Sequence, residues 1–560
     1  MAYPWEASYP DGVSWNIDLE IKPVDQLLQQ GVDAFPENVC CEFMGREFRY
    51  RDIEGLVDRA AKGLQELGVG KGSHVGILLP NTPHYIVLFF AVLRCGATVV
   101  NYSPLYAERE IAQQIEDSGT EIMVSLDLAL LYPKVAARLA DTGLKKIIVC
   151  NMPEVLPFPK SLLFKLLRKK DVAQVPADES HIRFAELTAN DGSYRPVEVD
   201  AHADTAVIAY TGGTTGRPKG AMLSHANLCS VVGLGEPWMM GSMIDGEERI
   251  FAVLPFFHIF GLTNIMISTV SAGSTMLVHP RFDADAVMKD FQTKRPTMFA
   301  GVPTMYTALV SHPAATATDF SSLKYCGSGG APLPVEIMAK FEDLAGCPII
   351  EGYGLTETAP TVSANPFRGT RKPGSVGLPL PQTVVEIVDL EDRDKVLGAN
   401  ERGEICVRGP QVMMGYWQRD DATAEAMAGD RFHTGDVGYL DDEGYLYLVD
   451  REKDMILSGG FNVYPRNIEE AIYEHPGVEE VTVIGIPDNY RGEAAKAFVK
   501  LKDPAGSLTL EELREFLTDK LGKHELLAEL EIRAELPKTP VGKLSKKELV
   551  AEETAKRGEG

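Results

Sequence analysis

The chain has 560 residues, more than the roughly 250–300 at which a single hydrophobic core stops growing, so we expect at least two domains. Hydrophobic residues make up 45% and charged residues 24%, which is typical of a soluble globular protein and excludes a mainly disordered, collagenous or coiled-coil chain. The formal net charge is −25, from 55 basic and 80 acidic side chains, which argues against nucleic acid as a partner. An anionic ligand must therefore meet a local cluster of cations or backbone N–H groups.

Eight cysteines are scattered along the chain without a CxxC pair or another clustered spacing. This pattern indicates a reducing compartment and no structural zinc site. The first residues lack the basic and apolar regions of a signal peptide, and no run approaches the roughly 18–20 apolar residues of a transmembrane helix. We therefore expect a cytoplasmic protein.

Short apolar, β-branched runs alternate with longer segments of helical periodicity over most of the chain, which predicts βαβ units and a largely parallel sheet. Segment 82–94 is mostly apolar, like a buried crossover helix, whereas segment 107–116 is amphipathic. The expected strands are 74–79, 98–101, 121–125, 146–149, 205–209, 250–254, 274–278 and 348–351.

Beyond residue 380 the expected strands become shorter and richer in turns, at 384–389, 403–408 and 445–449. A charged stretch at 450–454 then precedes a compact pattern of a helix, two strands and a helix, at 465–474, 481–485, 495–501 and 509–521. The remaining length of about 110 residues suits an α+β domain. We therefore predict an α/β fold with a large N-terminal domain (1–452), made of layered βαβ sheets plus a β-rich subdomain, and a small mobile α+β C-terminal domain (453–560).

The most informative segment is the run YTGGTTGRPKG at 210–220, which leaves an expected strand. Its glycines let the backbone turn sharply and approach a ligand closely, while its threonine hydroxyls and two cations can hold phosphate oxygens. The run lacks the closing Gly-Lys-Ser/Thr of a Walker loop, and an ordinary hairpin is the plainer alternative. The residues that this loop offers to a phosphate are Thr211, Gly212, Gly213, Thr214, Thr215, Gly216 and Lys219.

The run resembles the signature of the adenylate-forming superfamily, which includes acyl-CoA synthetases, luciferases and peptide-synthetase adenylation domains. Further motifs follow in the order of that family, up to residue 543. They are LPFFH (254–258), GSGGAP (327–332), EGYGLTE (351–357), TGD (434–436), DREKD (450–454) and PKTPVGK (537–543). So many motifs in one order are specific, and the resemblance implies an enzyme that activates a carboxylate with ATP.

The resemblance assigns most of the nucleotide site. It pairs the carboxylate of Glu357 with the hydroxyl of Thr211 as hard oxygen ligands of Mg²⁺ at the ATP phosphates. It implies that Thr356 donates to the α-phosphate and that Tyr353 lies beside the adenine, which would rest on a strip of small residues. The other residues of the implied nucleotide site are Gly329, Gly330, Ala331, Glu351 and Gly352.

Two further positions are implied at the sugar and the reacting groups. We expect Asp436 in a loop, where its carboxylate accepts both ribose hydroxyls, with Arg451 closing the other side. A turn-forming aspartate is the plainer interpretation without the resemblance. His258 is by itself most simply a core histidine, but the resemblance makes it face both the carboxylate substrate and the phosphates.

Lys543 lies in a Gly/Pro-punctuated segment near the C-terminus, where most lysines are solvated. The resemblance makes it the cation that enters the N-terminal domain during adenylation, where it would act mainly on the transition state. It also implies a hinge at Lys453, about which the C-terminal domain turns. Gly459 and Gly460 would then line a tunnel for the pantetheine arm of coenzyme A.

The implied reaction has two steps: the carboxylate attacks the α-phosphorus of ATP to give an acyl-adenylate and pyrophosphate, and the thiol of CoA then displaces AMP. Gly213, where many relatives carry Ser, and the runs 101–106 and 459–465 resemble bacterial long-chain fatty acyl-CoA synthetases, so we expect a medium- to long-chain fatty acid. A CoA ligase for an aromatic or sulfur-containing short acid stays open. So does a non-catalytic adenylate-binding sensor, although a sensor would not need Lys543, Glu357 and Asp436 together.

Segment 160–170 bears on membrane contact. As a helix it places Leu162, Leu163, Leu166 and Leu167 on one stripe, and it carries five cations and no acid. That composition suits docking on the anionic inner face of a membrane, where fatty acids partition. The alternative is a surface helix packed on the core of its own domain, with solvated lysines. The oligomeric state stays open, with a homodimer among the options.

Overall fold

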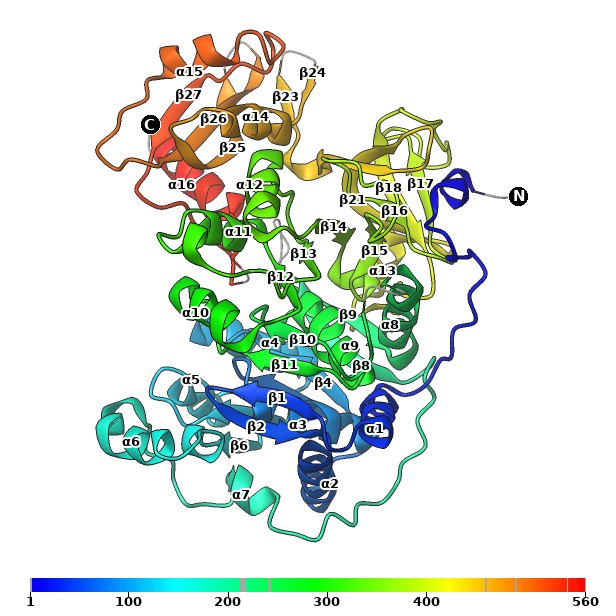
Figure 1. Cartoon of the computed structure of the whole chain (residues 1–560), viewed down its shortest axis with the longest axis vertical. Helices are drawn as coiled ribbons and strands as arrows, with labels where there is room; N and C mark the ends of the chain where they lie inside the picture. Colours follow the sequence, from blue (N-terminus) through cyan, green and yellow to red (C-terminus); the bar gives the residue numbers. More distant parts are fainter. Residues whose placement is uncertain are drawn as a thin grey trace.

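The computed structural model describes residues 3–211, 218–239, 243–458, 461–488, 491–540 and 542–558. Figure 1 shows a large body in the lower half of the view, a β-rich part at the upper right and the last hundred residues at the top. Two sheets form most of the large body, and helices pack around them.

The first sheet of the large body has the strand order β19-β9-β8-β4-β3-β5-β6-β7 in the described part of the chain. Its central strands pair in parallel and are mostly apolar, because helices cover both faces. β8 and β9 form an antiparallel hairpin in which Thr211 pairs with Lys219. The strands are β3 (His74–Leu78), β4 (Thr98–Asn101), β5 (Ile122–Leu126), β6 (Lys146–Cys150), β7 (His181–Arg183), β8 (Thr205–Thr211), β9 (Lys219–Ser224) and β19 (Gly415–Tyr416).

The second sheet has the order β16-β15-β14-β13-β12-β10-β11-β1-β2 among the described residues. β12, β13 and β14 are parallel neighbours, so their carboxyl ends meet at one edge, the usual place for a ligand in such a sheet. The strands are β1 (Val39–Phe43), β2 (Arg46–Arg49), β10 (Arg249–Ala252), β11 (Thr275–Val278), β12 (Met298–Gly301), β13 (Tyr325–Ser328), β14 (Ile349–Gly354), β15 (Thr361–Ala364) and β16 (Leu378–Pro379).

The β-rich part is an antiparallel sheet that confirms the change in texture expected after residue 380. Its strands are β17 (Val384–Val388), β18 (Gly403–Arg408), β20 (Met427–Ala428), β21 (Arg431–Leu440) and β22 (Leu446–Arg451). The expectation that Asp436 lies in a loop is wrong, because this residue lies within β21 and pairs with Arg451 of β22. The turn-forming sequence around it makes a bulge inside a strand.

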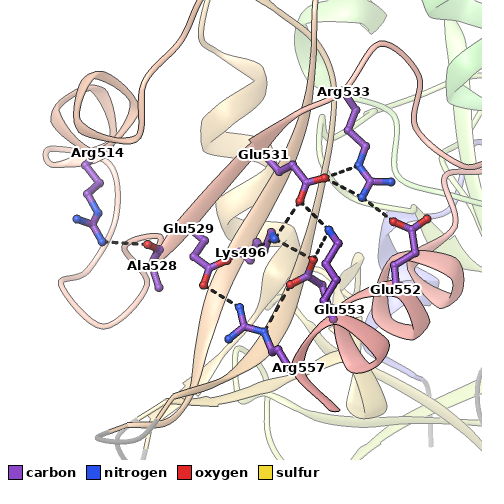
Figure 2. A network of polar contacts seen from close by, with 10 residues as sticks. Lys496, Arg514, Ala528, Glu529, Glu531, Arg533, Glu552, Glu553 and Arg557 are labelled. Carbon is purple, nitrogen blue, oxygen red and sulfur yellow. Dashed lines mark hydrogen bonds and ion pairs between the residues drawn. The ribbon is translucent and has the colours of Figure 1, made fainter. Parts of the chain in front are cut away.

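The C-terminal residues form a separate sheet with the order β24-β23-β26-β25, and β27 pairs with β26. Its strands are β23 (Ile456–Ser458), β24 (Phe461–Val463), β25 (Val478–Asp488), β26 (Gly492–Leu501) and β27 (Glu529–Ile532). Figure 2 shows how α16 (Lys546–Gly558) is tied to this sheet by a charge network. At its centre the buried ammonium of Lys496 lies 2.9 Å from Glu553 and 3.0 Å from Glu531. Since a buried cation is stable only with such partners, the network fixes α16 on the sheet.

The helices follow the sequence pattern closely where that pattern is periodic. The apolar crossover is α3, whose residues are all buried, and the amphipathic segment after it is α4. The helices other than α16 are α1 (Val24–Ala34), α2 (Tyr50–Glu66), α3 (Pro83–Arg94), α4 (Glu108–Ser118), α5 (Tyr132–Ala136), α6 (Lys160–Leu167), α7 (Phe184–Leu187), α8 (His225–Met239), α9 (Ser268–Ser271), α10 (Ala284–Lys294), α11 (Pro303–Val310), α12 (Val335–Ala345), α13 (Asp420–Ala426), α14 (Pro465–Tyr473) and α15 (Leu510–Leu517).

The position of the domain boundary stays a prediction. The predicted junction between residues 452 and 453 falls inside a short 3₁₀ turn, η8 (Glu452–Asp454), between β22 and β23. One large apolar core gathers residues 24–432, and the core that gathers residues 456–527 is separate from it. Among the helices of the described residues, none combines the length and the apolar composition needed to span a bilayer.

Candidate active site

A cavity of about 1220 Å³ lies between the large body and the C-terminal residues. Its volume exceeds the roughly 300–1,000 Å³ of a typical single-ligand pocket, which leaves room for two substrates together. It brings together every sequence-predicted site residue that lies in the described part of the chain. These are Thr211, Lys219, His258, Gly329, Gly330, Ala331, Glu351, Gly352, Tyr353, Thr356, Glu357, Asp436, Arg451, Lys453 and Lys543.

Seven other predicted residues lie outside the described part of the chain. They are Gly212, Gly213, Thr214, Thr215, Gly216, Gly459 and Gly460. The strand ends on either side of the first group are described: Thr211 ends β8 and Lys219 begins β9, and both line the cavity. The two ends of the glycine- and threonine-rich run therefore open onto the site.

One wall of the cavity is a strip of small residues after β13. A Cβ built on Gly329 would lie 3.3 Å from Cε1 of Phe260, and one on Gly352 would lie 3.1 Å from the carbonyl oxygen of Ser363. Gly330 has a φ of +84°, a left-handed conformation that favours glycine. Without side chains here, a flat ring can lie directly against backbone.

Glu351 of β14 lies behind this strip and is buried. The backbone N–H of Leu333 donates to its Oε1 at 3.0 Å, while Oε2 has no hydrogen-bond partner among the described residues. Burial raises the pKa of Glu351 to about 7, although the Leu333 N–H and the charge of Arg466 oppose the shift. The free oxygen can therefore accept a hydrogen bond or, when protonated, donate one.

Asp436, Tyr353 and Arg451 form a polar group that also lines the cavity. The hydroxyl of Tyr353 donates to Oδ2 of Asp436 at 2.7 Å, and Nε of Arg451 lies 3.3 Å from Oδ1. Burial raises the pKa of Asp436 and the charge of Arg451 opposes that shift. Sequence reasoning assigned only an aromatic face to Tyr353, and the structure adds its hydroxyl as a partner of Asp436.

Glu357 lies in the short turn η7 (Thr356–Thr358), with its carboxylate buried. The hydroxyl of Tyr416 donates to its Oε1 at 2.8 Å. No lysine, arginine or histidine of the described residues lies within ion-pair distance of it, and burial raises its pKa. η7 lies beside the end of β8, so the carboxylate of Glu357 and the hydroxyl of Thr211 face one cavity. Glu357 and Thr211 thus form a set of hard oxygen donors that has no cationic side chain paired with it in the described part of the chain.

Lys543 reaches this cavity from a tight hairpin of the C-terminal residues. The hairpin is closed by Thr539, whose backbone N–H donates to the carbonyl oxygen of Lys543 at 2.7 Å, and it is fastened to the large body where Thr304 donates to the carbonyl oxygen of Gly542 at 2.7 Å. Burial, reinforced by the charge of Arg451, lowers the pKa of Lys543 to about 8 despite the opposing charge of Asp436.

His258 stands between β10 and a π-helix, η5 (Phe260–Ile267). The backbone N–H of Phe260 donates to its Nδ1 at 3.3 Å, which orients the ring. Burial and the neighbouring charge of Lys543 lower the pKa of His258 to about 3. The imidazole is therefore neutral at physiological pH and can offer a hydrogen bond but not a charge.

The sequence did not indicate the residues that hold the two parts together. Nζ of Lys546 lies 3.4 Å from Glu469 of α14 and 3.9 Å from Asp450 of β22, and the backbone N–H of Arg466 donates to Asp450 at 2.9 Å. Asp450 belongs to the charged DREKD motif, in which the resemblance gives roles to Arg451 and Lys453 but none to Asp450. The motif gives a hint of such a role, but its partners lie in other elements and no local pattern identifies them.

The chain matches the AMP-binding enzyme family over residues 28–417 and the AMP-binding enzyme C-terminal domain over residues 467–543. A long-chain-fatty-acid–CoA ligase of Bacillus subtilis (strain 168) is 39% identical over 563 residues, which covers 98% of each chain. Another from Escherichia coli O157:H7 is 37% identical over 552 residues and covers 97% of each chain. Among solved structures, ATP-bound MatB from Rhodopseudomonas palustris gives a TM-score of 0.82 at 28% identity, over 95% of this chain and 99% of that one. These matches confirm the resemblance found in the sequence, and the chain belongs to the AMP-binding enzyme family.

Proposed function

We propose that this protein is an ATP-dependent fatty acid–CoA ligase that acts on medium- to long-chain fatty acids. The observation that carries the proposal is the position of Lys543. Its ammonium lies beside Gly330 in the same cavity as Asp436 and Glu357. That arrangement joins a cation, a site for a sugar and a set of metal ligands around one space, as the transfer of a nucleotide to a carboxylate requires.

ATP would bind with its adenine on the strip Gly329–Ala331 and its ribose hydroxyls on Asp436, held from the far side by Arg451. Oε2 of Glu351, which has no partner among the described residues, would supply a polar contact to the base. The phosphates would then run past Thr356 toward the loop between Thr211 and Lys219. In that loop, Gly212, Gly213, Thr214, Thr215 and Gly216 would supply the N–H groups and hydroxyls that hold the phosphates.

The donor set formed by Glu357 and Thr211 fits Mg²⁺, because both ligands are hard oxygens and the buried carboxylate lacks another cation in the described part of the chain. When bound, Mg²⁺ would neutralise charge on the ATP phosphates and orient them. Tyr416 holds Glu357 through its Oε1, which fixes the direction of the carboxylate toward the cavity.

In the first step the fatty acid carboxylate attacks the α-phosphorus of ATP, a P–O bond forms, and pyrophosphate leaves. Lys543 places a positive charge where the carboxylate and α-phosphate share developing negative charge, and the buried site strengthens that interaction. Nδ1 of neutral His258 accepts the Phe260 N–H, so the ring carries its proton on Nε2 and would donate one hydrogen bond to the carboxylate. Binding both substrates in one cavity supplies proximity.

In the second step the thiolate of CoA attacks the acyl carbon, and AMP leaves with the C–O bond electrons. A cation occupying the site of attack would block the thiol, so the C-terminal part must move and take Lys543 with it. We place the hinge at Lys453, with domains at 1–452 and 453–560. The turn would bring Gly459 and Gly460 to a tunnel for the pantetheine arm, where the absence of side chains leaves space.

The fatty acid chain would lie along α8. Val231, Gly235 and Trp238 fall on one face of this helix, about one turn apart, and all line the cavity. A Cβ built on Gly235 would meet only Cε of Met239, at 3.9 Å, so the groove is open at this point. A long apolar groove favours an aliphatic chain over a short polar acid.

A second surface supports an anionic membrane as a transient partner. α6 has no buried residue, and its leucines Leu166 and Leu167 are 65% and 76% exposed, whereas Phe164 turns toward the core. These exposed leucines favour docking over the predicted alternative, a surface helix packed on the core of its own domain, although Phe164 makes such a contact. α6 lies at the lower left edge of Figure 1, away from the C-terminal sheet. The exposed apolar side chains around it, here called the docking patch, are Met44, Leu130, Phe158, Leu162, Leu163, Leu166 and Leu167.

Two contacts link the outer members of the docking patch to α6. Lys160 donates from Nζ to the carbonyl oxygen of Met44 at 2.7 Å, and the N–H of Ala129, next to Leu130, donates to the carbonyl oxygen of Asp171 at 2.8 Å. Segment 160–170 also carries five cations, of which Arg168 is paired with Asp171 at 3.0 Å. Apolar side chains and cations in one segment suit an anionic bilayer, which combines hydrocarbon with negative headgroups.

Pyrophosphate release with ATP and Mg²⁺ tests the activity directly. We expect release with laurate, palmitate and oleate, and acyl-CoA with AMP once CoA is added. Turnover with an aromatic or sulfur-containing short acid but none with palmitate would support the rival ligase. Adenylate binding without pyrophosphate release from any acid would support the sensor.

A further inference from the structure

The strand that carries Asp436 bulges at that residue. β18 and β21 pair through Glu404 with Val437 and through Cys406 with His433. Only Ile405 lies between those positions on β18, whereas Thr434, Gly435 and Asp436 lie between them on β21. Two extra residues therefore leave the ladder, and such bulges re-aim side chains next to active sites.

A buried carboxylate spans this bulge. Oε1 of Glu404 accepts the backbone N–H of Gly435 at 3.0 Å, and Oε2 is hydrogen-bonded to Nδ1 of His433 at 2.7 Å. Both side chains are buried, at 6% exposed for Glu404 and 5% for His433. Hydrogen bonds to an ionised, buried carboxylate are stronger than neutral ones, so they hold the bulge in one shape.

The remaining contacts complete the bulge. The hydroxyl of Thr434 donates to the carbonyl oxygen of Ile405 at 2.7 Å and accepts the N–H of Asp436 at 3.1 Å. Gly435 has a φ of +69°, which turns the chain so that the next side chain leaves the sheet. Asp436 is then in direct contact with Tyr353 and Arg451 at the cavity.

Glu404 and His433 also gather with Cys406, whose Sγ lies 3.4 Å from Nδ1 of His433. Their ligand atoms lie within 4.8 Å of one another, close enough for a metal ion. Nδ1 and both carboxylate oxygens are already used in hydrogen bonds, which accounts for the cluster without an ion. Nε2 of His433 is buried without a partner in the described part of the chain, so the polar contacts of the ring are those of Nδ1 with Glu404 and Cys406.

We propose that Glu404, braced by His433, is a positioning residue that shapes the bulge and so aims Asp436 at the ribose of ATP. Glu404 touches no substrate in this role and acts through Gly435. The proposal rests on the proposed function, because it takes Asp436 as the residue that accepts the ribose hydroxyls. It predicts a loss of sugar discrimination when Glu404 is changed, beyond any loss of stability.

The test compares ATP with 2′-deoxyATP and 3′-deoxyATP in pyrophosphate release, with palmitate and without CoA. The ratio of kcat/KM for ATP to that for each deoxynucleotide measures how much the hydrogen bonds between Asp436 and the ribose hydroxyls contribute. A hydrogen bond to a charged group corresponds to a preference of roughly tenfold to hundredfold. We expect Glu404→Leu to bring this ratio close to that of Asp436→Ala, and the double variant to lower it no further.

Glu404→Gln is the conservative variant. Its amide oxygen can accept from Gly435 while His433 changes tautomer to accept from the amide N–H, so we expect a ratio between those of the wild type and Glu404→Leu. Cys406→Ala is the matched control, because it loosens packing against the same ring without removing the acceptor for Gly435. We expect it to keep the wild-type ratio.

The outcomes distinguish the ribose role of Asp436 from the positioning role of Glu404. A wild-type ratio in Asp436→Ala would refute the ribose role itself, and with it this part of the proposed function. A collapsed ratio in Asp436→Ala with a wild-type ratio in Glu404→Leu would overturn the positioning role alone, as would an equal loss in Cys406→Ala. If Glu404→Leu does not fold, Glu404→Gln decides, and an unchanged ratio in that variant overturns the proposal.

Discussion

The ammonium of Lys543 lies against Gly330, a residue more than two hundred positions earlier in the chain. A Cβ on Gly330 would stand 2.6 Å from Cε and 3.0 Å from Nζ of Lys543. The hairpin from the C-terminal sheet thus places its cation on the strip where we place the adenine and the α-phosphate. This arrangement agrees with the role in adenylation that we propose for Lys543.

Gly330→Ala should impair adenylation selectively. The new methyl group would collide with the Lys543 side chain and strain a backbone with φ of +84°, so we expect pyrophosphate release to fall by about tenfold or more. Thioester formation from supplied acyl-adenylate should change little. Gly346→Ala is the matched control, since Gly346 has a φ of +61° and nothing within 4 Å of its built Cβ. An equal loss in both half-reactions, or in both variants, would contradict the contact.

Adenylation should weaken at alkaline pH. The pKa of Lys543 is lowered to about 8, first by burial and then by Arg451, so the ammonium form prevails below that pH and is lost above it. We expect kcat/KM for pyrophosphate release, measured without CoA from about pH 6 to about pH 9.5, to fall above about pH 8. His258, with a pKa of about 3, should add no step near neutrality. In Lys543→Arg the residual activity should lack the alkaline decline, and the same decline there would assign it to another group.

Gly235→Leu should shorten the preferred fatty acid. The added side chain would fill the groove along α8, so we expect activity on palmitate and oleate to fall by about tenfold or more while activity on octanoate is retained. Glu236→Leu adds the same side chain on the exposed face of the helix and should leave the profile unchanged. A uniform loss across chain lengths would argue against the proposed acyl groove.

Replacing Lys165, Arg168 and Lys169 with Gln should weaken binding to vesicles rich in phosphatidylglycerol. At about 1 kcal/mol per cation, the affinity should fall by roughly a hundredfold, with activity on soluble short acids unchanged. Control replacements of Lys145, Lys289 and Lys523, exposed elsewhere, should have little effect. Unaltered vesicle binding in the triple Gln variant would refute the proposed role of these cations in membrane docking.

Leu166→Ser with Leu167→Ser separates the apolar part of that surface from its charge. These changes should weaken binding to phosphatidylcholine vesicles as well, because buried apolar area contributes regardless of headgroup charge. Co-sedimentation with both kinds of vesicle distinguishes the two contributions. Loss on anionic vesicles alone would mean that the leucines do not enter the bilayer.

The sequence predicts the buried strands well because short apolar, β-branched runs strongly favour a buried strand over a helix or loop. β4 (Thr98–Asn101) and β18 (Gly403–Arg408) occur at the predicted bounds, and the apolar crossover appears as α3. Asp436 shows the limit of this reasoning. Its Thr-Gly-Asp sequence favours a loop locally, and only the pairing of β21 with β18 and β22 shows that the turn is a bulge within a strand.

The residues of the candidate site could be predicted where they belong to a sequence motif. Residues that reach the site only through tertiary contacts could not. The described motif residues all meet at one cavity. Tyr416, which holds Glu357, and Glu404, which holds Gly435, lie in short or ordinary strands that give no local signal. The exposure of the α6 leucines was likewise invisible, since a surface helix packed on its core has the same periodicity as one that faces outward.

The separation of the two half-reactions in Lys543→Ala tests the central claim most directly. We expect pyrophosphate release from palmitate and ATP to fall by about a hundredfold or more, because the transition state loses its buried cation, while acyl-CoA forms from supplied palmitoyl-adenylate at close to the wild-type rate. Lys523→Ala, an exposed lysine of the same C-terminal part, should affect neither reaction. Equal loss of both half-reactions, or unimpaired pyrophosphate release, in Lys543→Ala would contradict the account.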